Sequence, residues 1–167
     1  MKHTQRIVQD ETYQCVFNAL RAGYRHVDTA SIYKNEAQVG RAVNDFVDEF
    51  TRSNPDIELR LEVTTKLSPH DCKSLSSTQQ AIQKCLSTLS LPNKRPNVKI
   101  DTTLLIHWPG ISGLATSSEE NARHRIENWS AMEESYQKGE FTRIGVSNFT
   151  VSHLHGTVIK LQNQTFR

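Results

Sequence analysis

Four short runs of apolar and β-branched residues recur along the chain, and each ends on a polar residue. The runs cover residues 24–28, 59–66, 102–107 and 143–147. Their polar ends fall at Asp28, Lys66, His107 and Ser147, so that successive ends are 38, 41 and 40 positions apart. Each run has the length and composition of a β-strand. A period near 40 is typical of one strand and one helix with their connections.

The segments between the runs have the apolar spacing of helices, and several carry start or stop signals. Asp10 is predicted as the N-cap of the first helix and Gly23 as its C-cap glycine. Two pairs of residues match the capping-box pattern of a helix start: Ser77 with Gln80, and Ser117 with Glu120. The helix after the second pair ends at Gly139. Two more helices are predicted over 35–50 and 151–161.

This alternation of strands and helices requires crossover connections, which predict a parallel sheet covered by helices. No GxGxxG motif follows any run, which argues against a dinucleotide-binding doubly wound sheet. The regular period instead favours a (β/α)8 barrel, but a complete one needs ~200 to 400 residues. We therefore expect a partial (β/α)8 TIM barrel of the α/β class, with about four parallel strands and flanking helices. Residues 1–167 are then a single incomplete domain.

Charge and cysteine content exclude several classes of function. Lys and Arg number 20 against 18 Asp and Glu, so the net charge of +2 offers no basic field for nucleic acid. The three cysteines, Cys15, Cys72 and Cys85, form no CxxC pair and no disulfide framework, and no metal site is predicted. No stretch approaches the ~20 apolar residues that cross a bilayer. A cytoplasmic protein without a membrane partner is the resulting prediction.

The carboxyl ends of barrel strands form the active face, which makes the polar ends of the runs candidate catalytic residues. Taken singly, each has a structural explanation. Asp28 can cap the next helix, Lys66 can extend from the strand end to solvent, and His107 can be a hydrogen-bonded core residue. Tyr33, five residues after Asp28, is by itself more typical of packing than of catalysis.

Taken together, these four residues suit the delivery of a proton to a carbonyl oxygen. A phenol has an unperturbed pKa of ~10, and a nearby ammonium group lowers that pKa by stabilising the phenolate. Lys66 can serve Tyr33 in this way while Asp28 holds the lysine in place. His107 can then donate a hydrogen bond to an oxygen that gains negative charge. Side chains cannot deliver a hydride, so a nicotinamide cofactor is predicted.

Three further residues are candidates for binding the cofactor and the substrate. Ser147 and Asn148 offer a hydroxyl and an amide that suit a carboxamide, although a serine and an asparagine also commonly end a strand in a turn. Trp108 can wall a substrate pocket with an apolar face, or it can belong to the core.

Four blocks of the sequence resemble the successive signatures of one known family, the aldo-keto reductases. The blocks are AGYRHVDTASIYKNEAQVGRAV, TTKL, DTTLLIHWPG and WSAMEESYQKGEFTRIGVSNF. The resemblance extends roughly over residues 10–154. It implies a (β/α)8 fold and NADPH-dependent reduction of a small aldehyde or ketone substrate.

The resemblance also implies a role for each candidate residue. In the family's catalytic tetrad, Tyr33 matches the proton donor, Lys66 the residue that lowers its pKa, Asp28 the support of that lysine, and His107 the residue that orients the carbonyl. Two further positions match nicotinamide contacts and one matches a substrate-pocket position: Ser147, Asn148 and Trp108.

Parts of the family pattern have no match in this sequence. The family's N-terminal hairpin and first strand lack a counterpart before residue 9, and the sequence stops where the sixth strand and the phosphate-binding loops are expected. We therefore expect a chain truncated at both ends that by itself binds NADPH weakly or not at all. Two hypotheses follow: a carbonyl reductase, or a catalytically inactive remnant that binds a partner or itself through open sheet edges.

Overall fold

The computed structural model describes residues 2–92, 95–115 and 118–155, and it confirms the predicted α/β fold with four parallel strands. The strands lie in one sheet in the order β1-β2-β3-β4. The elements are α1 (Lys2–Arg21), β1 (His26–Asp28), the 3-10 turn η1 (Ser31–Tyr33), α2 (Glu36–Ser53), β2 (Leu59–Leu67), α3 (Leu75–Leu89), β3 (Val98–Ile106), α4 (Glu120–Gln137) and β4 (Arg143–Val146). Residues 151–155 are also helical, and the rest of the helix predicted over 151–161 lies outside the described residues.

The chain divides into two compact units. The first unit comprises residues 1–65 and 84–103, and the second comprises residues 66–83 and 104–167. The prediction of a single domain for the whole chain stays a prediction.

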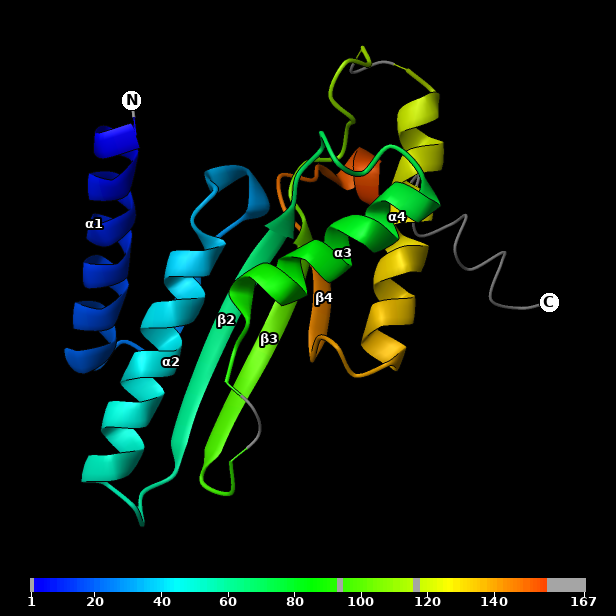
Figure 1. The fold of residues 1–167 in the computed structure, drawn as a ribbon. Coiled ribbons are helices and arrows are strands. Elements are labelled where there is room, and N and C mark those ends of the chain that lie inside the picture. Colours follow the sequence, from blue (N-terminus) through cyan, green and yellow to red (C-terminus); the bar gives the residue numbers. More distant parts are fainter. Residues whose placement is uncertain (1, 93–94, 116–117, 156–167) are drawn as a thin grey trace. The chain divides into compact units, whose positions relative to one another are not determined.

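The core of the first unit lies between one face of α2 and the strand β2. Apolar residues recur along α2 at helical spacing, so that they gather on one side of the helix. The buried cluster consists of Leu20, Val39, Val43, Phe46, Val47, Leu59, Leu61, Val63 and Leu89. Full burial of a side chain of this size contributes ~1.5 to 3 kcal/mol, so this cluster is the main stabilising contact of the unit. Helix α1 packs beside α2 (Figure 1).

Gly40 lets α2 approach the end of α3 closely. A Cβ atom at this position would lie 1.7 Å from the backbone carbonyl oxygen of Leu89. The side chain of Asn44 fastens the same approach, because its Nδ2 donates to the carbonyl oxygens of Gly40 at 2.8 Å and Ser90 at 2.9 Å. Backbone contact between the two helices is therefore possible only with glycine at position 40.

The second unit is built from α4, β4, the first part of α3 and the ends of β2 and β3. Helix α4 packs against β4. The buried apolar side chains of this unit include Leu67, Cys72, Ile82, Leu104, Ile106, Ala131, Met132 and Phe141. Burial raises the pKa of the Cys72 thiol to about 12, so this cysteine is an unreactive core residue.

Two predicted helix ends are confirmed, and both use a glycine with positive φ. Gly23 has φ 103 and Gly139 has φ 71. After α1, the amides of Gly23 and Tyr24 donate to the carbonyl oxygens of Leu20 and Ala19. Gly139 and the residue that follows it make the equivalent two hydrogen bonds to carbonyl oxygens of α4. This pair of backbone hydrogen bonds defines the Schellman motif, which satisfies carbonyl groups that the helix end would leave unpaired.

Several sequence-based boundaries are wrong. Strand β1 begins at His26 and not at residue 24, and α2 extends to Ser53 and not only to residue 50. Helix α1 begins at Lys2, so Asp10 lies inside the helix and is not its N-cap. No glycine or proline occurs between residues 2 and 22, so nothing in that segment interrupts the helix. Strand β3 begins at Val98 and not at residue 102, because Val98 and Ile100 pack on the core of the first unit.

The start of α3 is also predicted wrongly. The helix begins at Leu75, and its capping residue is Ser74 rather than Ser77. The Oγ of Ser74 accepts a bond from the amide of Ser77 at 3.2 Å, and the Oγ of Ser77 accepts one from the amide of Ser74 at 2.9 Å. These reciprocal bonds form a capping box with serine in place of the usual glutamate. The other proposed cap, Ser117, lies outside the described residues, and α4 begins at Glu120 with Glu119 at its N-cap position.

We predict that Gly40→Ala lowers the free energy of unfolding by about 1 to 3 kcal/mol, because the added methyl group collides with the backbone at Leu89. The gain in helix propensity, about 1 kcal/mol, is too small to offset this. Urea denaturation measures the change. The control is Ala37→Gly at an exposed position of the same helix, which reports the propensity effect alone. Unchanged or higher stability of Gly40→Ala would contradict the predicted close contact.

Candidate active site

In the first unit, β1 places Asp28 at the start of the loop that carries Tyr33. Strand β1 pairs in parallel with β2, with Asp28 opposite Thr64, and the amide of Thr29 extends the ladder by donating to the carbonyl oxygen of Thr64 at 2.8 Å. The chain then makes the turn η1, which ends at Tyr33. Tyr33 is 50% exposed, so its phenol is accessible to a reactant.

Two polar side chains at the start of α2 bind the ends of β1 and β2. The Oγ1 of Thr29 donates to the Oδ1 of Asn35 at 2.7 Å, and the Oγ1 of Thr65 donates to the Oε1 of Glu36 at 2.5 Å. Glu36 is buried, and this burial raises the pKa of its carboxyl group. Hydrogen bonds from Thr65 and Cys85 partly oppose that rise in pKa.

In the second unit, Lys66 and His107 end two neighbouring strands. Lys66 is the last but one residue of β2, and His107 directly follows β3. The amide of His107 donates to the carbonyl oxygen of Leu67 at 3.3 Å. Both Lys66 and His107 are 7% exposed, so Lys66 is not a surface lysine that extends into solvent.

The end of β4 contacts the residues that follow β3. The amide of Ser147 donates to the carbonyl oxygen of Ile106 at 2.8 Å, and the Nδ2 of Asn148 donates to the carbonyl oxygen of His107 at 2.8 Å. Asn148 adopts a left-handed backbone with φ 62, a conformation that asparagine tolerates better than most residues. The rings of His107 and Trp108 stack with centroids 6.1 Å apart, and Trp108 is 51% exposed.

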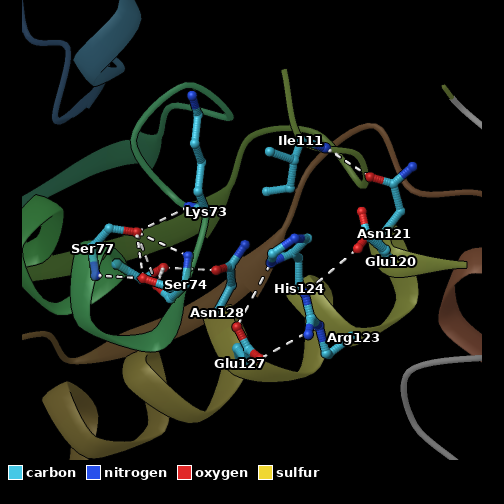
Figure 2. A network of polar contacts seen from close by, with 11 residues as sticks. Lys73, Ser74, Ser77, Ile111, Glu120, Asn121, Arg123, His124, Glu127 and Asn128 are labelled. Atoms are coloured by element: carbon cyan, nitrogen blue, oxygen red, sulfur yellow. Dashed lines mark hydrogen bonds and ion pairs between the residues drawn. The ribbon is translucent and has the colours of Figure 1, made fainter. Parts of the chain in front are cut away.

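Helix α4 anchors the loop that follows Trp108. The Oδ1 of Asn121 accepts a bond from the amide of Ile111 at 3.0 Å, and its Nδ2 donates to the carbonyl oxygen of Ala115 at 2.9 Å. Arg125 donates to the carbonyl oxygen of Pro109 at 3.1 Å. Figure 2 shows the side chain of Asn121 beside Ile111, joined to it by the first of these hydrogen bonds. Polar side chains of α4 thus fix the loop that begins beside Trp108.

Each unit brings together part of the predicted site. The first unit contains Asp28 and Tyr33, joined by one loop that Asn35 fastens. The second contains the remaining predicted residues, namely Lys66, His107, Trp108, Ser147 and Asn148. Sequence reasoning missed the two residues that hold the Tyr33 loop, Asn35 and Glu36. The only signal was an asparagine and a glutamate at a helix start, which is more typical of capping.

Comparison with known proteins identifies the family. The family model for the aldo/keto reductase family matches residues 1–162, which extends the resemblance of residues 10–154 at both ends. This chain belongs to the aldo/keto reductase family, a family of oxidoreductases that typically depend on NADP(H).

Solved structures and a curated relative agree with this. The crystal structure of an aldo/keto reductase from Brucella melitensis has a TM-score of 0.70 and 33% identity, over 91% of this chain and 48% of that one. The Bombyx mori aldo-keto reductase AKR2E4, solved in complex with NADP, has a TM-score of 0.65 and 31% identity, over 95% and 46% of the two chains. A glycerol 2-dehydrogenase (NADP(+)) of Saccharomyces cerevisiae is 31% identical over 163 residues, 87% of this chain and 46% of that protein.

The chain spans about half the length of the curated relatives that it matches. Within residues 2–92, 95–115 and 118–155, no helix combines the length and the apolar character needed to cross a membrane. In the same described part of the chain, no three His, Cys, Asp or Glu residues group in a way that could hold a metal ion.

Burial of Glu36 predicts a dependence of stability on pH. Its folded-state pKa is raised above the ordinary value of 4.5, so the folded chain holds this proton more tightly than the unfolded chain does. The resulting loss of stability begins as pH rises through 4.5 and is complete above the folded-state pKa. The free energy of unfolding of the wild type minus that of Glu36→Gln should therefore fall over this pH range. Urea denaturation at a series of pH values measures the difference.

Glu134→Gln is a control of opposite sign for this prediction. A hydrogen bond from Lys138 lowers the pKa of Glu134 below 4.5, so its stabilising contribution is present above 4.5 and is lost as pH falls through the folded-state pKa. The free energy of unfolding of the wild type minus that of Glu134→Gln should therefore rise with pH. A difference for Glu36→Gln that is flat, or that rises with pH, would show that the carboxyl group is not buried in this way.

Proposed function

We propose that this chain carries the carbonyl-reducing residues of an NADPH-dependent aldo-keto reductase, which converts an aldehyde or ketone into an alcohol. The observation that carries the proposal is the position of the four tetrad candidates. Asp28 ends β1, Lys66 lies at the end of β2, His107 follows β3, and Tyr33 lies in the loop after β1. In parallel α/β folds, the carboxyl ends of the strands are the usual place for catalytic side chains.

The proposed reaction adds a hydride to the carbonyl carbon and a proton to the carbonyl oxygen. The electron pair of the carbonyl π bond moves to oxygen, which takes the proton from the hydroxyl of Tyr33. The ammonium group of Lys66 stabilises the phenolate that remains, and Asp28 holds that ammonium group in place. A proton from solvent then restores the hydroxyl of Tyr33. His107 donates a hydrogen bond to the carbonyl oxygen while negative charge develops on it.

Ser147 and Asn148 are the residues proposed to hold the nicotinamide carboxamide. A carboxamide needs both donors and acceptors, and a hydroxyl together with a side-chain amide provides both. The two side chains lie next to each other at the end of β4, where the Nδ2 of Asn148 is 3.2 Å from the Oγ of Ser147. Asn148 is exposed, so a ligand can reach it. When bound, NADPH supplies the hydride and becomes NADP+.

Trp108 is proposed to form an apolar wall for the substrate. Its ring is half exposed and stacks against the ring of His107, the proposed donor to the carbonyl oxygen. An apolar surface beside a polar anchor suits a small carbonyl compound that carries a hydrocarbon group.

We predict that the purified chain oxidises NADPH in the presence of a generic aldehyde, and that Tyr33→Phe lowers kcat by about 100-fold or more because the proton donor is lost. The loss of NADPH absorbance measures the rate, with NADPH supplied in large excess. Tyr136→Phe is the matched control, because Tyr136 is also a half-exposed tyrosine but lies on α4 and has no proposed catalytic role.

Two outcomes would contradict the proposal. Aldehyde reduction that persists in Tyr33→Phe at the wild-type rate would refute the role of Tyr33 as proton donor. A folded wild-type chain without any turnover would refute the reductase proposal and favour the non-catalytic alternative. In that alternative the outermost strands of the described sheet, β1 and β4, bind another chain along their open edges.

A further inference from the structure

The loop that joins β1 to α2 is fastened at both of its ends by residues of the first unit. At its start, Thr29 donates to the side chain of Asn35 at 2.7 Å. At its far end, Glu36 accepts a bond from Thr65 at 2.5 Å. Thr29 directly follows Asp28, and Thr65 directly precedes Lys66. The consecutive pair Asn35 and Glu36 therefore connects the loop that carries Tyr33 to the ends of two strands.

Burial makes these two hydrogen bonds hard to replace. Thr29 is 1% exposed, Thr65 is fully buried and Glu36 is 6% exposed. If one partner is removed, water cannot readily reach the other to replace the lost hydrogen bond. A buried carboxylate without a hydrogen bond is strongly destabilising. An apolar side chain of similar size often stabilises such a position better than a buried charge does. A glutamate here is thus better explained by the geometry it imposes than by the stability it adds.

Asn35 and the residue before it both adopt arrangements that their residue types do not favour locally. Asn35 occupies the N-cap position of α2, yet its side chain makes no capping bond to the helix. Asparagine is among the best N-cap residues, so the usual stabilisation is given up in favour of the bond from Thr29. Lys34, the residue before it, adopts a left-handed backbone with φ 56, which is unfavourable for a lysine. Such local costs persist where the surrounding contacts fix the conformation.

We propose that Asn35 and Glu36 are positioning residues that fix the Tyr33 loop on the ends of β1 and β2. The proposal rests on the proposed function, in which Tyr33 delivers the proton to the carbonyl oxygen. The two residues do not contact the reactants in this scheme. They act by restricting the loop, so that the hydroxyl of Tyr33 spends more of its time where proton transfer is possible.

Hydrogen exchange tests the positioning role without any need for turnover. The amides of Thr29, Tyr33 and Lys34 are bonded to backbone carbonyl groups and so report opening of the loop. Thr65→Val removes the hydroxyl while keeping the shape of the side chain. We expect it to accelerate exchange at these amides by about tenfold relative to residues 43–47 in the middle of α2. Thr65→Ser, which keeps the hydroxyl, should restore exchange to within about threefold of the wild type.

A second pair of variants covers the case in which Thr65→Val does not fold. Asn35→Ala removes the acceptor for Thr29 at a half-buried position, and Asn35→Asp keeps an oxygen at the same place. The alanine variant should show the same selective acceleration, and the aspartate variant should not. Unchanged exchange in the loop, or equal acceleration in the loop and at residues 43–47, would overturn the proposal, because either result means that no local restriction was lost.

Turnover distinguishes failure of this inference from failure of the proposed function. If the wild type reduces an aldehyde, Thr65→Val should lower kcat by about tenfold while the KM for NADPH stays within about twofold, because only the position of Tyr33 changes. A rise in the KM for NADPH as large as the fall in kcat would contradict a positioning role. If the wild type shows no turnover, the proposed function fails, and the exchange measurement still decides whether Asn35 and Glu36 restrict the loop.

Discussion

The parallel pairing of β1 with β2 determines where every candidate residue of the first unit lies. It sets Asp28 opposite Thr64, and the amide of Thr29 adds one more bond to the same ladder. Because a register shift of one residue turns every side chain to the other face, this ladder must be held firmly. The buried cluster between α2 and β2 holds it, and that packing in turn requires Gly40 to lie against α3.

Strand β2 combines two kinds of packing along its length. In its first half, apolar residues alternate with more exposed ones, and the apolar set joins the core of the first unit. In its second half, Thr64, Thr65 and Lys66 are all buried although each is polar. Polar groups in such a position destabilise a fold unless they are bonded, and proteins commonly accept this cost where a site needs the groups. The change in packing coincides with the start of the candidate site.

The sequence allowed the four parallel strands, and the strand ends that carry the candidate residues, to be predicted, because they depend on local patterns. A period near 40, the polar ends of the runs and the glycines at 23 and 139 are each legible within a few residues. The start of β3 was missed because its first residues pack on a core that is distant in sequence. The start of α3 was missed because Ser74 and Ser77 are both plausible caps, and only their reciprocal hydrogen bonds distinguish them. Glu36 was missed for a related reason: its partner Thr65 lies 29 positions away.

The central claim is that the side chains at these strand ends perform carbonyl reduction. The most direct test is to incubate the chain with an aldehyde and with NADPH that carries deuterium at the hydride-donating carbon, and to analyse the product by mass spectrometry. We predict an alcohol with one deuterium on the carbon that bears the hydroxyl group, and its loss in Lys66→Met. Absence of labelled alcohol above the level of a protein-free control, or labelling that is unchanged in Lys66→Met, would contradict the account.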